Sequence, residues 1–173
     1  MILAEKLSRA ISKLEINNVF LTGADIKLFR HPGVIKPEHT SIDVTEETKW
    51  SLSPSGDILI CHVRRTLTGT LVEAAEENGT SVEGEEKKAL LFDVLYAVQY
   101  VVTDPDRTID EHTFEVFCKT NAVYNSYPYY REYVQSTCAR MGIPPIVMSF
   151  LKPLTMKQIV EMFPDKATEN PQS

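Results

Sequence analysis

Hydrophobic and polar residues alternate along most of the first hundred positions, after one short segment with a helical spacing. The apolar residues of that segment recur at steps of three and four, which predicts a helix over residues 3–15 that ends at Asn17-Asn18. They are Leu3, Leu7, Ala10, Ile11 and Leu14. The alternation then predicts four strands, over residues 19–30, 42–52, 58–72 and 88–103.

The fourth predicted strand differs from the others because both of its faces are apolar. Phe92 and Val94 belong to one apolar row that runs from Leu90 to Val102, while Leu91 and Leu95 lie on the other face. A strand of this kind is usually buried on both faces, so we expect its second face to meet another subunit. The glutamate-rich residues 73–86 before it predict a solvated loop, and docking of a basic partner is the alternative.

Helical spacing returns after Pro105. Thr108 and Glu111 have the spacing of a capping box, and Pro128 suits the first turn of a second helix. We expect that helix to run to about Met141, because Gly142 and the prolines after it end a helix. A last short helix follows the predicted cap Thr155, and residues 164–173 have the composition of a disordered tail.

Strands followed by helices are typical of an α+β domain, so we predict a four-stranded antiparallel sheet with helices packed on one face. The chain has 173 residues and shows no internal repeat or linker, which favours one domain over residues 1–163 with an extra helix at its start.

Net charge and cysteine content limit the kinds of partner and the cellular compartment that we expect for this protein. The net charge of −6 disfavours a nucleic-acid partner, because phosphate contacts need clustered Lys and Arg. No apolar run is long enough for a membrane span, and the first residues do not resemble a secretory signal. Cys61, Cys118 and Cys138 are far apart and odd in number, so we interpret them as reduced thiols in a cytoplasmic protein.

We find no motif that indicates catalysis. A phosphate-binding loop, a nucleophile elbow and a zinc-protease motif are all missing from the sequence. The best alternative is a metal-dependent hydrolase built on the acids and histidine near residue 110, although helix capping explains them more simply. The residues in question are Asp104, Asp106, Asp110, Glu111 and His112.

Aromatic residues cluster between positions 124 and 133. Tyrosine combines a large apolar ring with a polar tip, so this cluster is either ordinary core or a binding or oligomer surface. Trp50 and the apolar stripe of the last predicted helix leave the same two alternatives open. The cluster is Tyr124, Tyr127, Tyr129, Tyr130 and Tyr133.

The run Tyr-Pro-Tyr-Tyr-Arg-Glu-Tyr at residues 127–133, followed by Met-Gly-Ile-Pro-Pro at 141–145, resembles the C-terminal half of SecB, the bacterial export chaperone, and of SecB-like chaperones. A weaker likeness is Asp25-Ile26 in the first strand. The resemblance extends from about residue 17 to about residue 163. It implies an ATP-independent holdase that binds non-native polypeptides, with no cofactor, no metal and no enzymatic activity.

The resemblance also implies where clients and subunits bind. The family binds unfolded chains in an apolar groove between the loop after the first strand and the C-terminal helix, and it forms homotetramers through the long helix. The corresponding groove residues are Val34, Ile35, Ile42, Val44, Trp50, Met156, Ile159, Val160 and Phe163. The corresponding interface residues are Tyr129, Tyr130, Tyr133, Val134, Thr137 and Met141.

Two kinds of client follow from the resemblance. Asp25 matches one acid through which the export chaperone docks SecA, but Phe29 stands where the next such acid is expected. A preprotein delivered to SecA and an antitoxin protected by a relative of SecB therefore both remain as clients. The hypothesis from a different class is a non-catalytic adaptor that keeps the fold and binds one folded partner.

Overall fold

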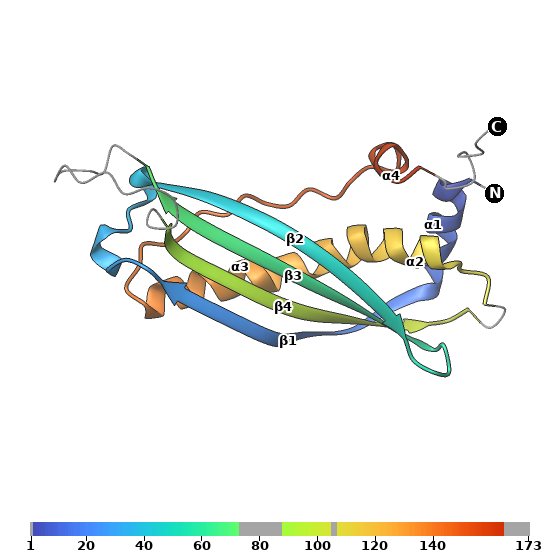
Figure 1. Cartoon of the computed structure of the whole chain (residues 1–173). Helices are drawn as coiled ribbons and strands as arrows, with labels where there is room; N and C mark the ends of the chain where they lie inside the picture. Colours follow the sequence, from blue (N-terminus) through green and yellow to red (C-terminus); the bar gives the residue numbers. More distant parts are fainter. Residues whose placement is uncertain (1, 73–87, 105–106, 165–173) are drawn as a thin grey trace, which may run out of the picture.

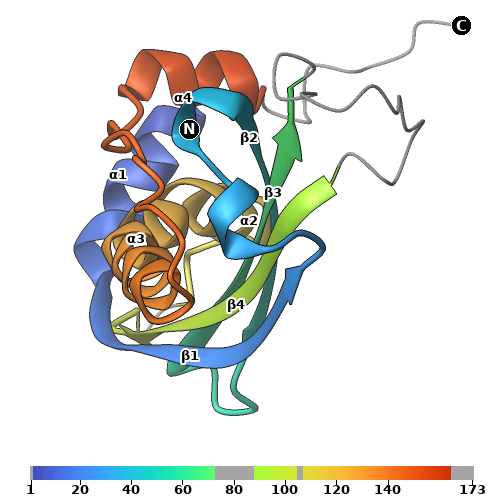
Figure 2. The same ribbon diagram turned by 90° about the vertical axis from the view of Figure 1, so that its left-hand side faces the viewer.

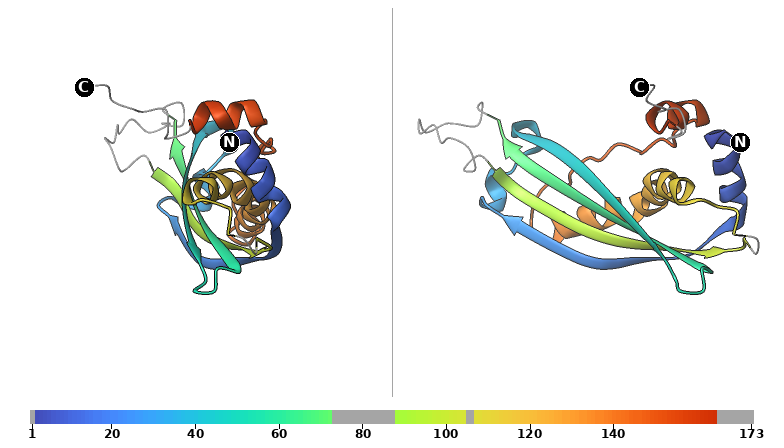
Figure 3. Two further views of the ribbon diagram at one scale, coloured as in Figure 1. Left: turned by 90° about the vertical axis from the view of Figure 1, so that its right-hand side faces the viewer. Right: turned by 45° about the vertical axis from the view of Figure 1, so that its right-hand side comes forward.

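The chain forms one antiparallel sheet with helices on one side, as seen in a computed structural model that describes residues 2–72, 88–104 and 107–164. The strand order across the sheet is β1-β4-β3-β2. Figure 1 shows the long strands running side by side, and Figures 2 and 3 show the helices gathered on one face. The strands are β1 (Leu14–Leu28), β2 (Thr40–Leu52), β3 (Ile58–Leu71) and β4 (Lys88–Val102).

The helices lie before and after the sheet in the chain. Two short 3-10 turns, η1 and η2, occupy the connection from β1 to β2, and a π-helical turn, η5, joins the second and third α-helices. The predicted α+β class and the helix at the start of the chain are therefore confirmed. The bounds are α1 (Leu3–Lys13), η1 (Pro32–Val34), η2 (Pro37–His39), α2 (Glu111–Phe117), η5 (Cys118–Ala122), α3 (Val123–Arg140) and α4 (Met156–Met162).

Alternation in β3 and β4 separates the two faces of the sheet as the sequence predicts. Side chains such as Leu59 and Val63 of β3, and Phe92 and Val98 of β4, are fully buried under the helices. On the other face, Leu91 and the rest of its row are largely half-buried among the side chains of neighbouring strands. Whether a second subunit covers that outer face stays a prediction.

Two predicted element boundaries are wrong. The first helix does not end at Asn17-Asn18 but at Lys13, because β1 begins at Leu14, which is buried and pairs with Val102 of β4. Asn17 is the extra residue of a bulge in that pairing, and Asn18 pairs with Gln99. Pro128 does not start a helix either, since it lies inside α3. Burial of Tyr130 and Val134 on that helix outweighs the loss of one backbone hydrogen bond at an interior proline.

Cap predictions had mixed outcomes. Thr155 begins α4 with a complete capping box to Gln158, and Gly142 follows α3 with a φ of 68°, a backbone conformation that glycine adopts without strain. The predicted capping box at Thr108 is wrong. The N-cap of α2 is Asp110, whose side chain accepts a hydrogen bond from the backbone N–H of Thr113 at 2.8 Å.

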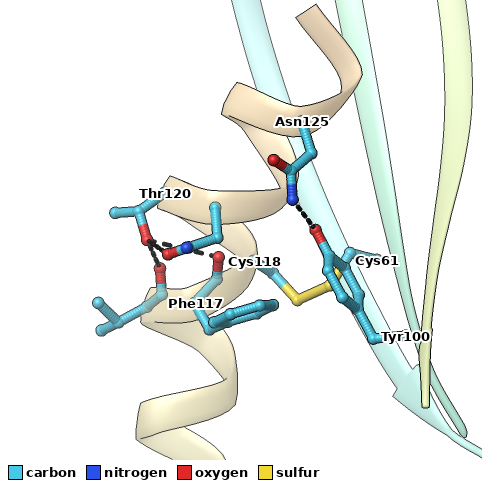
Figure 4. The surroundings of a disulfide bond; sticks show 8 residues. Cys61, Tyr100, Phe117, Cys118, Thr120 and Asn125 are labelled. Atoms are coloured by element: carbon cyan, nitrogen blue, oxygen red, sulfur yellow. Dashed lines mark hydrogen bonds between the residues drawn. A yellow bond between two sulfur atoms is a disulfide. The ribbon is translucent and has the colours of Figure 1, made fainter. Parts of the chain in front are cut away.

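The expectation of three reduced thiols is also wrong. Cys61 of β3 and Cys118 of η5 form a disulfide, and only Cys138 is free among the described cysteines. Alternation places Cys61 on the helix-facing side of β3, and the helical stripe that continues from α2 into η5 places Cys118 opposite it. Figure 4 shows the bond beside Tyr100, whose hydroxyl accepts a hydrogen bond from Asn125 at 2.8 Å. The disulfide therefore ties the sheet to the π-helical turn.

Replacing Asp110 tests the cap of α2. Besides Thr113, this carboxylate binds Lys6 of α1 at 2.8 Å. Partial burial raises the pKa of Asp110, but the hydrogen bonds from Lys6 and Thr113 outweigh it and lower the pKa to about 2. We expect Asp110→Ala to lower the free energy of unfolding by about 1 kcal/mol. Asn is also a good N-cap, so Asp110→Asn should lower it less.

The pH dependence identifies the charge contribution. The folded-state pKa lies below the value of about 3.9 in an unfolded chain. The carboxylate therefore stabilises the fold above about pH 4 and loses this contribution as pH falls towards 2. Urea unfolding should show the gap between the native protein and Asp110→Asn closing over that range. A gap that is independent of pH would mean that packing, not charge, separates the two proteins.

Candidate functional site: an apolar trough along β2

The helix-facing side of edge strand β2 carries apolar side chains that stay exposed. Ile42 is 38% and Val44 44% exposed, although Leu67, which pairs with Val44 on the neighbouring strand, is fully buried. In β3 and β4 the helices cover this side of the sheet, but towards β2 the covering is incomplete. An exposed row of this kind on the inner side of a sheet marks a binding surface more often than an ordinary solvent face.

Three hollows lie beside β2, the first at Thr40 and Ile42 and the other two around Glu46. We call them together the trough, and we call residues 142–155 between α3 and α4 the connector. The first hollow, of about 280 Å³, lies between the 3-10 turns, the start of β2 and the connector. Its walls are almost wholly apolar, with Thr40 as the exception. They are Ile35, Pro37, Thr40, Ile42, Leu90, Pro144, Pro145, Ile146 and Val147.

A close backbone approach shapes the floor of this first hollow. Gly69 of β3 lies opposite Ile42, and a Cβ at Gly69 would sit 2.8 Å from Cγ of Leu90. Only glycine lets the Leu90 side chain lie across β3 and form the floor. A methyl group at this position would have to displace Leu90, which would change the shape of the hollow.

The other two hollows lie at the α4 end of the trough. The second, of about 340 Å³, is lined by α1, the start of α3, the connector and α4, and the third, of about 470 Å³, lies between β2, Lys119 and the end of α4. Glu46 of β2 lines both, so the two adjoin. Figure 1 shows the connector running beside the sheet from the end of α3 to α4, which makes it the wall opposite β2.

A buried arginine holds the middle of the trough together. Arg65 is 2% exposed, and its Nε donates to Glu46 at 2.8 Å. Its other nitrogens donate to Ser126 Oγ at 3.0 Å and to the carbonyl of Val123 at 2.6 Å. Burial lowers the pKa of Arg65, and the Glu46 carboxylate opposes that effect. The guanidinium thus joins β2, β3 and the start of α3.

Two aromatic rings of α3 lie against this arginine, and one of them reaches the connector. The Cζ atom of Arg65 lies 5.5 Å from the ring centre of Tyr127 and 5.4 Å from that of Tyr130. The hydroxyl of Tyr127 donates to the carbonyl of Ser149 in the connector. Burial raises the pKa of Tyr130, whose hydroxyl has no partner in the described part of the chain. Two of the clustered tyrosines are therefore structural.

The predicted groove residues divide into three groups. Five of them line the hollows: Ile35 and Ile42 the first, Met156 and Ile159 the second, and Phe163 the third. Another three are exposed but line none of the described hollows, namely Val34, Val44 and Val160. Trp50 is half-buried against the core, with its ring centre 5.5 Å from that of Phe114.

The predicted interface residues are likewise divided. Tyr130 and Val134 are fully buried inside the protomer, so neither offers surface to a partner. Tyr129 is 51% exposed, and Tyr133, Thr137 and Met141 are half-buried. An interface through this helix stays a prediction. Asp25, the predicted docking residue, is exposed on the outer face of the sheet and binds Lys27 at 2.9 Å.

Two of the acids considered for a hydrolase have structural partners. Asp104 binds Lys13 and Thr108, and Asp110 caps α2. Asp106 and the glutamate-rich loop lie outside the described residues. Within residues 2–72, 88–104 and 107–164, no group of three or more His, Cys, Asp and Glu is placed to hold a metal ion. In the same residues, no helix is both long and apolar enough to span a membrane.

Sequence reasoning missed the charged and connector residues of the trough. Glu46 and Lys119 line two hollows each, and Leu151 and Leu154 of the connector line one. Glu46 occupies an inward position in the alternation of β2, opposite Arg65 of β3. The sequence could have revealed this pair, because opposite charges at two inward-facing positions indicate a buried ion pair, and buried charges need a partner.

Comparison with solved structures identifies this architecture. The chain is similar to a SecB-like chaperone of Mycobacterium tuberculosis, solved in complex with a peptide from the HigA1 antitoxin. The TM-score is 0.71 at 18% identity, covering 87% of this chain and 99% of that chain. This chain has the SecB-like fold. The resemblance inferred from the aromatic run and the Gly-Ile-Pro-Pro segment is thus confirmed at the level of the fold.

Other comparisons add little to the SecB-like assignment. A weaker likeness is to a protein of unknown function from Streptococcus agalactiae, with a TM-score of 0.33 and 9% identity over 79% of this chain and 98% of that chain. No protein-family model and no curated protein matches the sequence. The SecB-like fold is therefore carried by the structure, with the trough between β2 and the connector as its candidate site.

Proposed function

We propose that this protein is an ATP-independent holdase that binds extended, non-native polypeptides in the trough. The observation that carries the proposal is the exposed inner side of β2, where Ile42 opens onto an apolar hollow and Glu46 lines two more that adjoin each other. Separate hollows along one line suit an extended chain whose alternate side chains enter them. Flexible methionines at the α4 end let one surface accept different side chains.

A non-native antitoxin is the client class to test first. The SecB-like chaperone of Mycobacterium tuberculosis was solved with a peptide from an antitoxin, which supports a client of that kind here. Delivery to SecA has less support. Asp25 is paired with Lys27, and Phe29, 45% exposed, replaces the next acid that the resemblance implies.

Aggregation of a chemically denatured model protein tests the proposal directly. The intact chain should suppress light scattering when it is present at equal or moderately higher concentration than the denatured protein. Suppression needs no nucleotide, because a holdase only shields exposed apolar segments. Scattering that is unchanged at large excess would contradict the proposal and would favour an adaptor for one folded partner.

Replacing Ile42 tests the location of the site. A carboxylate at this position would have to be desolvated by an entering apolar side chain, so Ile42→Glu should weaken binding of a labelled unfolded peptide about tenfold, equivalent to about 1.4 kcal/mol. Fluorescence anisotropy gives the dissociation constants. The matched control is Thr45→Glu, which adds the same charge on the outer face of the same strand. Equal weakening by both variants would point to a general charge effect and away from the trough.

A further inference from the structure

The second hollow of the trough contains a wall that comes from the helix at the start of the chain. Its volume is about 340 Å³, and its apolar lining comes from four separate segments. Polar side chains occur there as well, including Glu46, Lys119 and Asn121. The apolar lining is Ile11 of α1, Val123 and Tyr124 of α3, Leu151, Pro153 and Leu154 of the connector, and Met156, Ile159 and Met162 of α4.

Helix α1 is fixed in place by three other residues, which leaves Ile11 at the edge of the buried stripe. Leu3, Leu7 and Ala10 are at most 1% exposed in the core cluster that also contains Ile159 of α4. Ile11 is 41% exposed. An isoleucine that is not needed to anchor its helix and that lines a hollow is available for contact with a ligand.

Helix α4 depends on α1 for its position. It is only seven residues long, and its single buried side chain, Ile159, enters the cluster formed by α1. At its other end the ring of Phe163 lies 5.7 Å from the Lys119 ammonium. With α4 held at these two points, Met156 and Met162 line the hollow, and Met162 is 58% exposed. The shape of the hollow is therefore set jointly by α1 and α4.

We infer that α1 completes the client-binding site, and that the second hollow takes one large apolar side chain, aromatic or long aliphatic, of a bound non-native polypeptide. This inference rests on the proposed function. Three observations favour a client side chain as the occupant. The hollow adjoins the next one at Glu46, its size falls at the lower end of ligand pockets, and two flexible thioethers line it.

Filling the hollow tests this inference. Ile11→Trp places a bulky ring where the client side chain would enter, on a helix that three other residues anchor. Binding should be measured with two unfolded peptides that differ only by Phe or Ala at one position. We expect Ile11→Trp to weaken binding of the Phe peptide about tenfold and to leave binding of the Ala peptide almost unchanged. The control is Arg9→Trp, about 200° around the helix from Ile11.

Each other outcome has a distinct meaning. If the native protein binds the Phe peptide and Ile42→Glu weakens it, but Ile11→Trp does not, α1 lies outside the site and the proposed function stands. If the native protein binds neither peptide, the proposed function itself fails. If Ile11→Trp alters only the solution mass, a second copy of the chain occupies the hollow and the inference is overturned.

A second variant keeps the test valid if Ile11→Trp does not fold. Ile11→Cys, labelled on the exposed thiol with a photoreactive group, should cross-link to the Phe peptide several times more than to the Ala peptide. The same label at Arg9→Cys should show no preference. Equal cross-linking from both positions would overturn the inference, because it would show that the peptide has no preference for the side of α1 that carries Ile11.

Discussion

Reduction of the Cys61–Cys118 disulfide should lower the free energy of unfolding by about 4 kcal/mol, the value expected for closing a loop of this length in the unfolded chain. The two cysteines are 57 residues apart and join β3 to η5, so the loop includes β4 and the start of the helices. Both are at most 1% exposed, and a reductant will therefore act mainly on opened molecules. Urea unfolding of the oxidised and the fully reduced protein gives the difference.

Variants separate the bond from other effects of the reductant. The double variant Cys61→Ala, Cys118→Ala should be less stable than the oxidised protein and should not respond to reductant. Cys138→Ala should keep the full response, because Cys138 is a free thiol in another part of the core. Equal unfolding midpoints for the oxidised and reduced native protein would mean that the bond does not form.

Removal of the Arg65 side chain should have the other large effect. Arg65→Met keeps much of the apolar stem but removes three hydrogen bonds, to Glu46, Ser126 and the carbonyl of Val123. Breaking a buried charged pair costs about 3 to 5 kcal/mol. Because the side chain of Glu46 is 34% exposed and partly rehydrates, we expect a loss of about 3 kcal/mol, at the lower end of that range.

The neighbouring residue provides a matched control. Arg64 is on the outer face of the same strand, where its Nε and one Nη donate to the two carboxylate oxygens of Asp93. Arg64→Met therefore breaks an ion pair that is already in contact with water, and such pairs contribute little. Chemical unfolding should place Arg65→Met far below Arg64→Met in stability. Similar losses of unfolding free energy in the two variants would mean that burial does not determine how much each arginine ion pair stabilises the fold.

The alternation of β3 and β4 predicted the sheet well because each strand has one strongly apolar face. Boundaries were less predictable where pairing overrides local preference. Asn17-Asn18 would end an isolated helix, but pairing with β4 extends β1 through them. Pro128 would begin an isolated helix, yet the chain is already helical there because α2, η5 and α3 follow one another without a break. Neither competing contact is visible in the local sequence.

The disulfide could not be predicted from cysteine spacing. Alternation placed Cys61 on the inner side of β3, and the helical stripe placed Cys118 on the inner side of its helix. The sequence pattern does not say at which height the helix crosses the strand, and that height decides whether the sulfur atoms meet. An odd number of cysteines was therefore a poor guide to their oxidation state.

The trough was only partly predictable for the same reason. Apolar residues on predicted strands and helices, such as Ile42 and Met156, were identified from the hydrophobic pattern and the family resemblance. The part played by α1 was missed because Ile11 was counted in the buried stripe with Leu7 and Ala10. Burial of three residues is enough to anchor this helix, and the structure shows that the fourth faces the hollow.

The connector has a mechanical property that follows from its backbone. Residues 144–154 form no backbone-to-backbone hydrogen bond within the described chain, whereas β2 is paired with β3 along its whole length. The connector is held instead by buried Ile146 and Met148 and by the hydroxyl of Tyr127. The β2 side of the trough is thus held along its whole length, whereas the connector side is held only at separate points. If a polypeptide occupies the trough as proposed, side chains of different size can be accommodated by sideways displacement of the connector, without breaking the hydrogen bonds between β2 and β3.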